Sequence, residues 1–206
     1  MGSIMEKTDN FKKALQDLID GKPIIVVDDF DRENEGDLVM TAEKVSKETL
    51  IFAINNARGL MCLPCEGEIL DRLEIPIMVP KTSDPLETPF TITVDHITTG
   101  TGMSVDDRIK TINGFTNDNS KPEDFKRPGH LFPLRARKGL LTERKGHTEA
   151  SIELMKLINV KPIAVIIEIM NDNGTMSRLP DLEIFAKKHD LCIVSIEEIY
   201  ETVYGK

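Results

Sequence analysis

The segment Asp28-Asp29-Phe30-Asp31-Arg32-Glu33-Asn34-Glu35-Gly36-Asp37 separates two apolar runs, Ile24–Val27 and Leu38–Met40. The apolar runs predict two buried strands, extending over 24–27 and 38–42. The segment between them carries six acidic side chains and one arginine in ten positions. Loops that follow buried strands often hold binding and catalytic residues, so this loop is the first candidate site.

Carboxylates this dense repel one another, and a fold keeps them together where a cation, a ligand or water offsets the repulsion. Hard divalent cations prefer oxygen ligands, which favours Mg2+ or Mn2+. Arg32 among the carboxylates indicates that a negative group, such as a phosphate or an enolate, is also bound here. The alternative interpretation is a solvated acidic loop without a ligand.

The composition is that of a globular protein of 206 residues, 40% hydrophobic and 30% charged, with a formal net charge of −9. An acidic chain without a basic stripe is a poor candidate for binding nucleic acid or anionic membranes. No apolar run reaches the ~18 residues that a membrane span requires. Three cysteines cannot form a disulfide framework, which predicts a cytoplasmic location and structural thiols at Cys62, Cys65 and Cys192.

The rest of the chain alternates predicted helices and strands. Helices are expected over 8–20 with Thr8 as the cap, 46–58, 66–73, 104–111, from 148 onward, 181–189, and after the capping box Ser195-x-x-Glu198. Further strands are expected over 60–63, 90–95, 130–136, 163–170 and 191–194, and loops over 76–89 and 113–128. The pattern predicts an α+β fold: a single three-layer domain over residues 1–206, with a mixed sheet flanked by helices. Residues 1–5 are expected to be disordered or derived from cloning.

A second cluster, Arg144-Lys145-Gly146-His147-Thr148, places two cations before a predicted helix start. Free backbone N–H groups, the positive helix end and fixed cations together make an anion site that would suit a sugar phosphate. His147 can bind a metal when neutral, and Thr148 can donate to a phosphate oxygen. Plain surface exposure of these basic residues is the alternative.

Glu168 is the only charged residue in the run 163–170. A carboxyl in such a strand is expected to be partly buried, and burial raises its pKa toward the range useful for acid–base catalysis. His130 is a second candidate proton carrier, and its alternative is a structural role. A metal ion, a phosphate-binding site and proton carriers together suit enolisation of a small phosphorylated ketose.

Four ordered motifs resemble the 3,4-dihydroxy-2-butanone 4-phosphate synthase family, and the similarity runs from about Phe11 to the last helix. The motifs are 31–37 (DRENEGD), 127–130 (RPGH), 146–150 (GHTEA), and Glu168 followed by 171–176 (NDNGTM). The resemblance implies conversion of D-ribulose 5-phosphate to L-3,4-dihydroxybutan-2-one 4-phosphate and formate in riboflavin biosynthesis. It also implies Mg2+ or Mn2+, a homodimer and an α+β fold.

The same resemblance implies roles for individual residues. Glu33 and His147 would bind the metal and, with the neighbouring groups, the substrate; the other substrate-binding residues would be Asp28, Arg32, Asp37, Arg144, Lys145, Gly146 and Thr148. The expected catalytic residues are His130, Glu168, Cys62 and Glu35. Because some members carry a second, GTP cyclohydrolase II domain and nothing here follows the last helix, a monofunctional protein is expected.

Two rival functions fit the same residues. One is a metal-dependent ketose-phosphate isomerase or aldolase, which shares enolisation with the lyase. The other is a divalent-cation-binding or interaction protein that uses only the acidic loop. The lyase interpretation requires Glu33 and His147 to lie close enough to share one ion, within a chain or across a subunit boundary.

Overall fold

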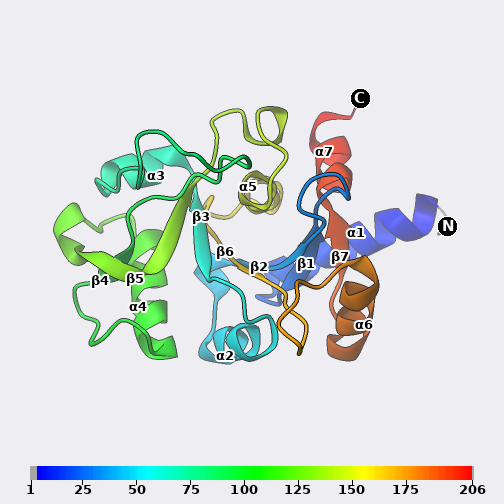
Figure 1. Ribbon diagram of the computed structural model, residues 1–206, viewed down its shortest axis with the longest axis horizontal. Helices are drawn as coiled ribbons and strands as arrows, with labels where there is room; N and C mark the ends of the chain where they lie inside the picture. The colour runs from blue at the N-terminus through cyan, green and yellow to red at the C-terminus, as the bar shows by residue number, and fades with distance from the viewer. Residues whose placement is uncertain (1–3, 206) are drawn as a thin grey trace.

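The computed structural model describes residues 4–205, with side chains from residue 9, and shows helices on both sides of one mixed sheet (Figure 1). Its strands are β1 (Ile24–Val27), β2 (Gly36–Thr41), β3 (Cys62–Cys65), β4 (Val94–His96), β5 (Phe125–Arg135), β6 (Ala164–Glu168) and β7 (Ile193–Ser195). Its helices are α1 (Ile4–Ile19), α2 (Lys47–Asn56), α3 (Gly67–Arg72), α4 (Val105–Thr116), α5 (His147–Leu157), α6 (Leu179–His189) and α7 (Ile196–Tyr204).

The sheet has the strand order β4-β5-β3-β6-β2-β1-β7. The pairs β1–β7 and β3–β5 are parallel, and the pairs β1–β2, β2–β6, β3–β6 and β4–β5 are antiparallel. The β2–β6 register sets Asp37 opposite Glu168. The end of the acidic loop therefore lies beside the carboxylate of β6, although the two are far apart in the sequence.

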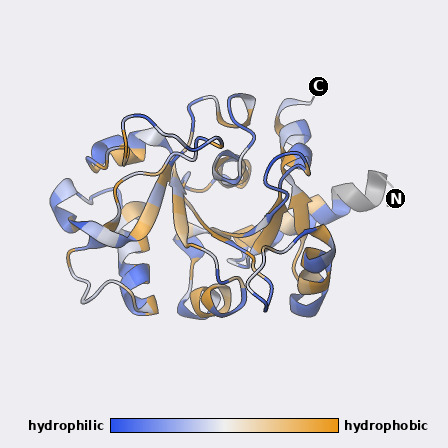
Figure 2. Ribbon diagram, viewed as in Figure 1, coloured by the Kyte–Doolittle hydropathy of each residue, from blue (hydrophilic) through white to orange (hydrophobic). Residues whose placement is uncertain are grey.

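Alternate residues along the central strands face two separate cores. Ile25 and Leu38 pack with α2, α4 and α6, whereas Ile24, Val26 and Val39 pack with α1, α5 and α7. Figure 2 shows the hydrophobic strands enclosed between helices whose outer surfaces are polar. Each fully buried aliphatic side chain stabilises the fold by about 1.5–3 kcal/mol, so the two cores hold the three layers together. The predicted fold class is confirmed.

Most predicted elements are present, and their differences have local causes. The predicted loop over 113–128 was wrong, because α4 continues to Thr116 and β5 begins at Phe125. Phe115 is buried and stacks edge-on against Phe125 at 5.0 Å, so tertiary packing extends both elements into polar sequence. The predicted strand 90–95 is regular only from Val94, and Phe90 forms an isolated bridge to Leu134.

The helix starts illustrate which local signals were reliable. Ser46, Ser104 and the Ser195–Glu198 capping box all cap helices as predicted. Thr8 does not cap α1, because that helix begins at Ile4 and also includes Met5. The remainder of the predicted disordered segment, residues 1–3, lies outside the described residues. Across residues 4–205, none of the helices combines the length and apolar character needed to cross a lipid bilayer.

Candidate active site

Asp28 follows β1 directly, and its buried side chain organises the acidic loop. Its Oδ2 accepts hydrogen bonds from the backbone N–H of Glu33 and from Arg32 Nη1, both at 2.9 Å. Its Oδ1 accepts the backbone N–H of Glu35 at 2.8 Å. These donors offset the repulsion among the carboxylates and fix the direction in which the Glu33 side chain leaves the loop.

Glu33 and His147 face each other across the loop and the start of α5. Glu33 Oε1 lies 2.8 Å from Arg32 Nη1, and Glu33 Oε2 lies 3.8 Å from His147 Nδ1. Ligand atoms of Asp28, Glu33 and His147 all lie within 4.8 Å of one another. Because both Asp28 oxygens already accept protein hydrogen bonds, Glu33 and His147 are the better candidates to hold an ion. The distance that the lyase interpretation requires is met within one chain.

The chemistry of His147 also fits a metal ligand. The imidazole is buried, and its Nε2 has no hydrogen-bond partner. Burial lowers the pKa of His147, while the carboxylates of Asp28 and Glu33 oppose that effect. Carboxylate oxygen atoms are the ligands that Mg2+ and Mn2+ prefer, and a neutral imidazole beside them can add one nitrogen ligand.

Glu33 and His147 line a pocket of about 280 Å3 at the ends of the central strands. Its predicted members are Arg32, Glu33, Glu35, Asp37, Cys62, Arg144, His147, Thr148 and Glu168. Its remaining walls come mainly from the loop 76–89 and β5 and comprise Leu86, Thr88, Phe90, Leu134 and Ile166. Residues from six separate parts of the sequence therefore converge here.

The carboxyl groups in the pocket differ in their environments. Glu168 Oε2 accepts the backbone N–H of Leu60 at 2.7 Å. Burial raises the pKa of Asp37 well above its usual value, and the neighbouring Glu168 and Glu33 charges raise it further. Burial also raises the pKa of Glu35, aided by Glu33 and opposed by Arg178. Asp37 and Glu35 are therefore groups that can exchange protons nearer neutral pH than an exposed carboxyl.

Cys62 lines the pocket, but its environment disfavours the thiolate. Burial raises the pKa of the Cys62 thiol, and the Glu168 and Asp37 charges act in the same direction. Cys65 is likewise buried, with a raised pKa. Since the thiolate is the nucleophilic form, Cys62 contributes shape and a weak donor to the pocket rather than a nucleophile.

The start of α5 brings two guanidinium groups to the anion side of the pocket. A Cβ atom at Gly146 would overlap Arg144 Nη1 and come within 3.0 Å of Arg32 Nη2, so glycine lets both arginines approach the helix start. Arg144 is held there by Glu149, whose Oε2 accepts Arg144 Nη1 at 2.7 Å, and by the Leu86 carbonyl. Free N–H groups and two fixed cations make this end of the pocket suitable for a phosphate.

Of the predicted site residues, four do not line this pocket: Asp28, His130, Lys145 and Gly146. Lys145 turns toward α7, where its Nζ lies 3.0 Å from Glu197 Oε2 and 4.4 Å from the Tyr200 ring centroid. It lines a neighbouring cavity that also borders Asp28 and Arg32. Lys145 therefore points away from Arg144, because the acidic and aromatic face of α7 attracts its ammonium group, and its role in substrate binding stays a prediction.

His130 lies in a different cavity, of about 200 Å3, bordered by Leu60, Met103 and Arg108. Its Nδ1 is 2.7 Å from Asp95 Oδ2, and its backbone N–H donates to Asp95 Oδ1 at 2.9 Å. Within one chain, His130 does not line the cavity of Glu33 and His147. The carboxylate of Asp95 holds the imidazole on β5, at the side of the sheet nearest β4.

Two functional candidates were missed in the sequence. Arg178 Nη1 donates to the carbonyls of Glu33 and Asn34 at 2.7 and 2.6 Å, which clamps the acidic loop from the start of α6. It comes two residues after the NDNGTM motif, so that motif was its nearest signal. Asp95 is the only charged residue in the run 90–95, and this isolated carboxylate was the signal that could have identified it.

The fold and this pocket together define a class: α+β enzymes that combine a hard-cation ligand set with an anion-binding helix start. The particular family follows from the sequence. A family model for 3,4-dihydroxy-2-butanone 4-phosphate synthase matches residues 12–202, and the chain belongs to this family. The family prediction made from the four motifs is confirmed, and with it a place among the lyases of riboflavin biosynthesis.

Relatives and solved structures agree with this placement. The chain is 45% identical over 194 residues to the 3,4-dihydroxy-2-butanone 4-phosphate synthase of Agrobacterium fabrum, covering 94% of this chain and 91% of that protein. It is 49% identical over 197 residues to the riboflavin biosynthesis protein RibBA of Aquifex aeolicus, covering 94% of this chain but 48% of that protein, so it spans about half that relative's length. The structure of a 3,4-dihydroxy-2-butanone 4-phosphate synthase in complex with two magnesium ions superposes with a TM-score of 0.90 at 35% identity, over 95% of this chain and 98% of that one.

Proposed function

We propose that this chain converts D-ribulose 5-phosphate to L-3,4-dihydroxybutan-2-one 4-phosphate and formate. The observation that carries the proposal is the single pocket in which Glu33 and His147 adjoin each other, next to an arginine-flanked helix start. An isomerase or aldolase would also use a metal ion and a phosphate-binding site, but the family membership favours the lyase. We infer further that the enzyme is cytoplasmic and that residues 1–206 form a single domain.

Glu33 and His147 would hold Mg2+ or Mn2+. Such an ion, when bound, stabilises negative charge on the carbonyl and hydroxyl oxygens of a ketose. Asp28 and Arg178 keep Glu33 in place from the two sides of the loop. His147 stays neutral because it is buried, which leaves its lone pair available.

Arg32, Arg144 and the N–H groups at the start of α5 would bind the substrate phosphate, with Thr148 as a further donor. Glu168, Asp37 and Glu35 would then lie along the carbon chain, where they can carry protons. The reaction requires enolisation, loss of water, a rearrangement that moves one carbon, rehydration and release of formate. The water lost in one step returns in a later one, so a five-carbon phosphate yields a four-carbon phosphate and formate without an external oxidant.

We propose that the enzyme is a homodimer in which a second chain completes the site. His130 supports this, because its side chain is 44% exposed and it stands outside the pocket of its own chain. The exposed apolar side chains of Leu60 and Met103 border the same cavity, and a second chain seated there would cover them together with His130. A two-fold axis would give each pocket a His130 from the other chain.

Formate release tests the proposed reaction. Purified enzyme stripped of metal by EDTA is given uniformly 13C-labelled ribulose 5-phosphate, with Mg2+ or Mn2+ restored, and the products are followed by 13C NMR. Labelled formate should appear in a 1:1 ratio with the four-carbon phosphate, and only with added metal. Isomerised pentose phosphate or aldol fragments without formate would establish the rival enzyme class.

Mixing two inactive variants tests the dimer. Glu33→Ala and His130→Ala damage different pockets, so a heterodimer would contain one intact site and one doubly damaged site. After equal mixing through a denatured state, about a quarter of the wild-type sites should be restored. The control is a mixture of Glu33→Ala with His147→Ala, which share a pocket within one chain and should restore nothing. Absence of recovery in the first mixture, with dimers seen by light scattering, would contradict the shared site.

A further inference from the structure

The segment that follows α2 runs beside the end of β6. Met170 N–H donates to the Ala57 carbonyl at 2.9 Å, and Gly59 N–H donates to the Glu168 carbonyl at 3.1 Å. Arg58 forms an antiparallel bridge with Ile169 between these two bonds. Residues 57–60 are therefore held in a fixed register against the strand end that carries Glu168.

Gly59 is placed where no other residue fits. A Cβ atom built on it would come within 2.5 Å of the Glu168 carbonyl oxygen and 2.7 Å of the Glu168 nitrogen, and would overlap Glu168 Oε2. The next residue, Leu60, then donates its backbone N–H to that same Oε2 at 2.7 Å. Because Gly59 has no side chain, the Glu168 carboxylate can lie against residues 57–60 and accept the Leu60 N–H.

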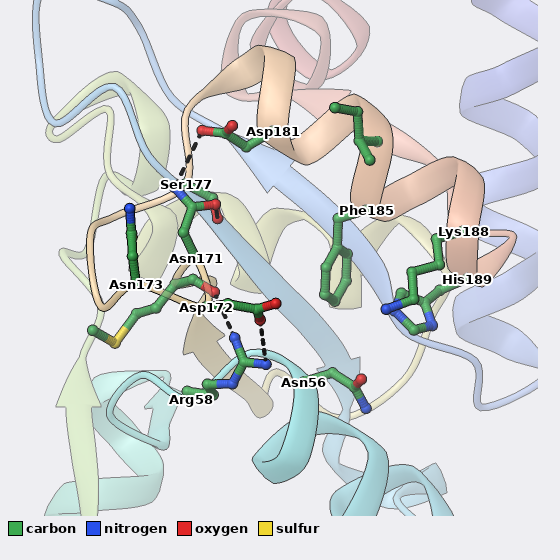
Figure 3. A pocket seen from close by; sticks show the side chains of 12 residues that line it. Asn56, Arg58, Asn171, Asp172, Asn173, Ser177, Asp181, Phe185, Lys188 and His189 are labelled. Carbon is green, nitrogen blue, oxygen red and sulfur yellow. Dashed lines mark hydrogen bonds and ion pairs between the residues drawn. The ribbon is translucent and has the colours of Figure 1, made fainter.

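Arg58 gives the segment the turn that this arrangement needs. Its φ of 74° lies in the left-handed region, which side chains other than glycine rarely adopt. Its guanidinium holds the turn closed, because Nη1 donates to the Met170 carbonyl at 3.2 Å and Nη2 lies 2.8 Å from Asp172 Oδ1. Figure 3 shows Arg58 reaching across to Asp172 at the edge of a cavity of about 370 Å3 between α2 and α6.

Stability alone gives little reason for the Arg58–Asp172 pair. The Arg58 side chain is 42% exposed and that of Asp172 is 95% exposed, and exposed ion pairs contribute little to folding. Their position distinguishes them, because they close the turn at Arg58. The next two residues, Gly59 and Leu60, fix the position of the Glu168 carboxylate. A small change in that turn would move a proton carrier without disturbing either core.

We propose that Arg58 and Gly59 are positioning residues for Glu168, acting through the Leu60 N–H. This inference rests on the proposed function, in which Glu168 carries a proton. Neither Arg58 nor Gly59 lines the pocket of Glu33 and His147, so within one chain they act on that pocket through Glu168. Gly59 also borders the cavity of His130.

Gly59→Ala is the first test, with Gly100→Ala as its matched control. A Cβ atom at Gly100 would make only an ordinary contact, at 3.5 Å from Asp107 Oδ2, so that variant should behave as wild type. Gly59→Ala should lower kcat at least 100-fold, while KM for ribulose 5-phosphate and the Mg2+ affinity measured by calorimetry change less than threefold. A merely structural role would instead lower Tm and leave the kcat of the folded fraction unchanged.

The Arg58 variants provide a second test that does not depend on tolerating a new side chain at Gly59. Arg58→Ala should lower kcat about tenfold and Asp172→Ala by less, because Asp172→Ala leaves the Arg58 bond to the Met170 carbonyl in place. The double variant should lower kcat no further than Arg58→Ala, which already removes the contact with Asp172. Lys47→Ala breaks another exposed ion pair, with Asp106 at 2.9 Å, and should leave kcat unchanged. Arg58→Lys should recover part of the loss.

Glu168→Gln separates failure of this inference from failure of the proposed function. If Glu168→Gln is inactive but still binds substrate, while Gly59→Ala and Arg58→Ala retain full kcat, the positioning role is overturned and the function stands. If Glu168→Gln itself retains full kcat, the role proposed for Glu168 fails, and the positioning inference fails with it.

Discussion

The two imidazoles proposed to take part in the reaction lie in contrasting surroundings. His147 is buried in its own chain, 3.8 Å from Glu33, within a pocket that also holds the anion-binding helix start. His130 is 44% exposed and stands in a separate cavity, paired with the buried Asp95. The contrast teaches that one chain would complete the proposed metal and phosphate sites but would leave the proposed proton carrier His130 at its surface.

The two environments also prepare the imidazoles for different chemistry. Burial lowers the pKa of His147 and favours the neutral form that a metal needs. For His130, the Asp95 carboxylate accepts a hydrogen bond from Nδ1, which leaves Nε2 free to take a proton. We therefore expect substitutions in the two regions to be equally harmful to turnover but different in their effect on metal binding.

The largest expected effects separate the two regions directly. Glu33→Ala and His147→Ala should each reduce turnover by at least about 1000-fold and abolish tight Mn2+ binding, because each removes half of the ligand pair. His130→Ala should reduce turnover by a similar factor with Mn2+ affinity unchanged. Turnover is measured by formate release and Mn2+ binding by electron paramagnetic resonance.

Circular dichroism provides the control for these variants, since all three should retain the fold and unfold cooperatively. A Glu33→Ala or His147→Ala enzyme with near-normal turnover would show that the ion is held elsewhere. Loss of Mn2+ binding in His130→Ala would remove the distinction between the two regions.

A smaller effect is expected from Asp95→Asn, which keeps the shape of the side chain but removes its charge. The amide no longer favours the tautomer with its proton on Nδ1, so kcat should fall roughly 10- to 100-fold while KM and Mn2+ affinity hold. Asp17→Asn is the matched control, since Asp17 is also buried but lies with Lys13 and Cys192, away from both cavities. Nitrogen chemical shifts of His130 report the tautomer, and an unchanged tautomer with full kcat would show Asp95 to be structural.

Local chemistry explains why parts of the site could be predicted from the sequence. Some signals are contained in a short stretch of sequence. They are the dense carboxylates around Glu33, the helix start at Gly146–His147, and the serine caps of α2 and α4. The strands of the sheet centre were predictable for the same reason, because their apolar runs are uninterrupted.

The features that were missed depend on partners distant in sequence. Lys145 turns away because Glu197 and Tyr200 of α7 lie beside it, and nothing near Lys145 in the sequence indicates this. Arg178 reaches the carbonyl of Glu33 across 145 positions, and carbonyl acceptors leave no mark in a sequence. The sequence separation of such contacts, rather than their strength, decided what could be predicted.

The smallest effect concerns stability, and it tests whether the buried pocket is strained by its own charges. Asp37 is buried opposite Glu168, and burial together with the Glu168 and Glu33 charges raises its pKa in the folded chain. Below the usual carboxyl pKa near 4, Asp37 is protonated whether the chain is folded or unfolded, and no penalty arises. As the pH rises toward the folded-state pKa, the unfolded chain loses this proton first, so Asp37 lowers the free energy of unfolding.

Asp37→Asn removes that penalty and should therefore stabilise the chain while impairing turnover. The gain should be near zero at pH 4 and should grow with pH, by about 1.4 kcal/mol for every pH unit by which the folded-state pKa exceeds the unfolded one. In a chain of this size each kcal/mol raises Tm by about 2–4 °C.

Calorimetric scans of both proteins from pH 4 to 8 measure the difference, with Asp17→Asn as the control. A gain that does not depend on pH would mean that packing, rather than charge, separates the two proteins. A gain that rises with pH, together with impaired turnover, would mean that the pocket keeps a destabilising carboxyl because the reaction uses it.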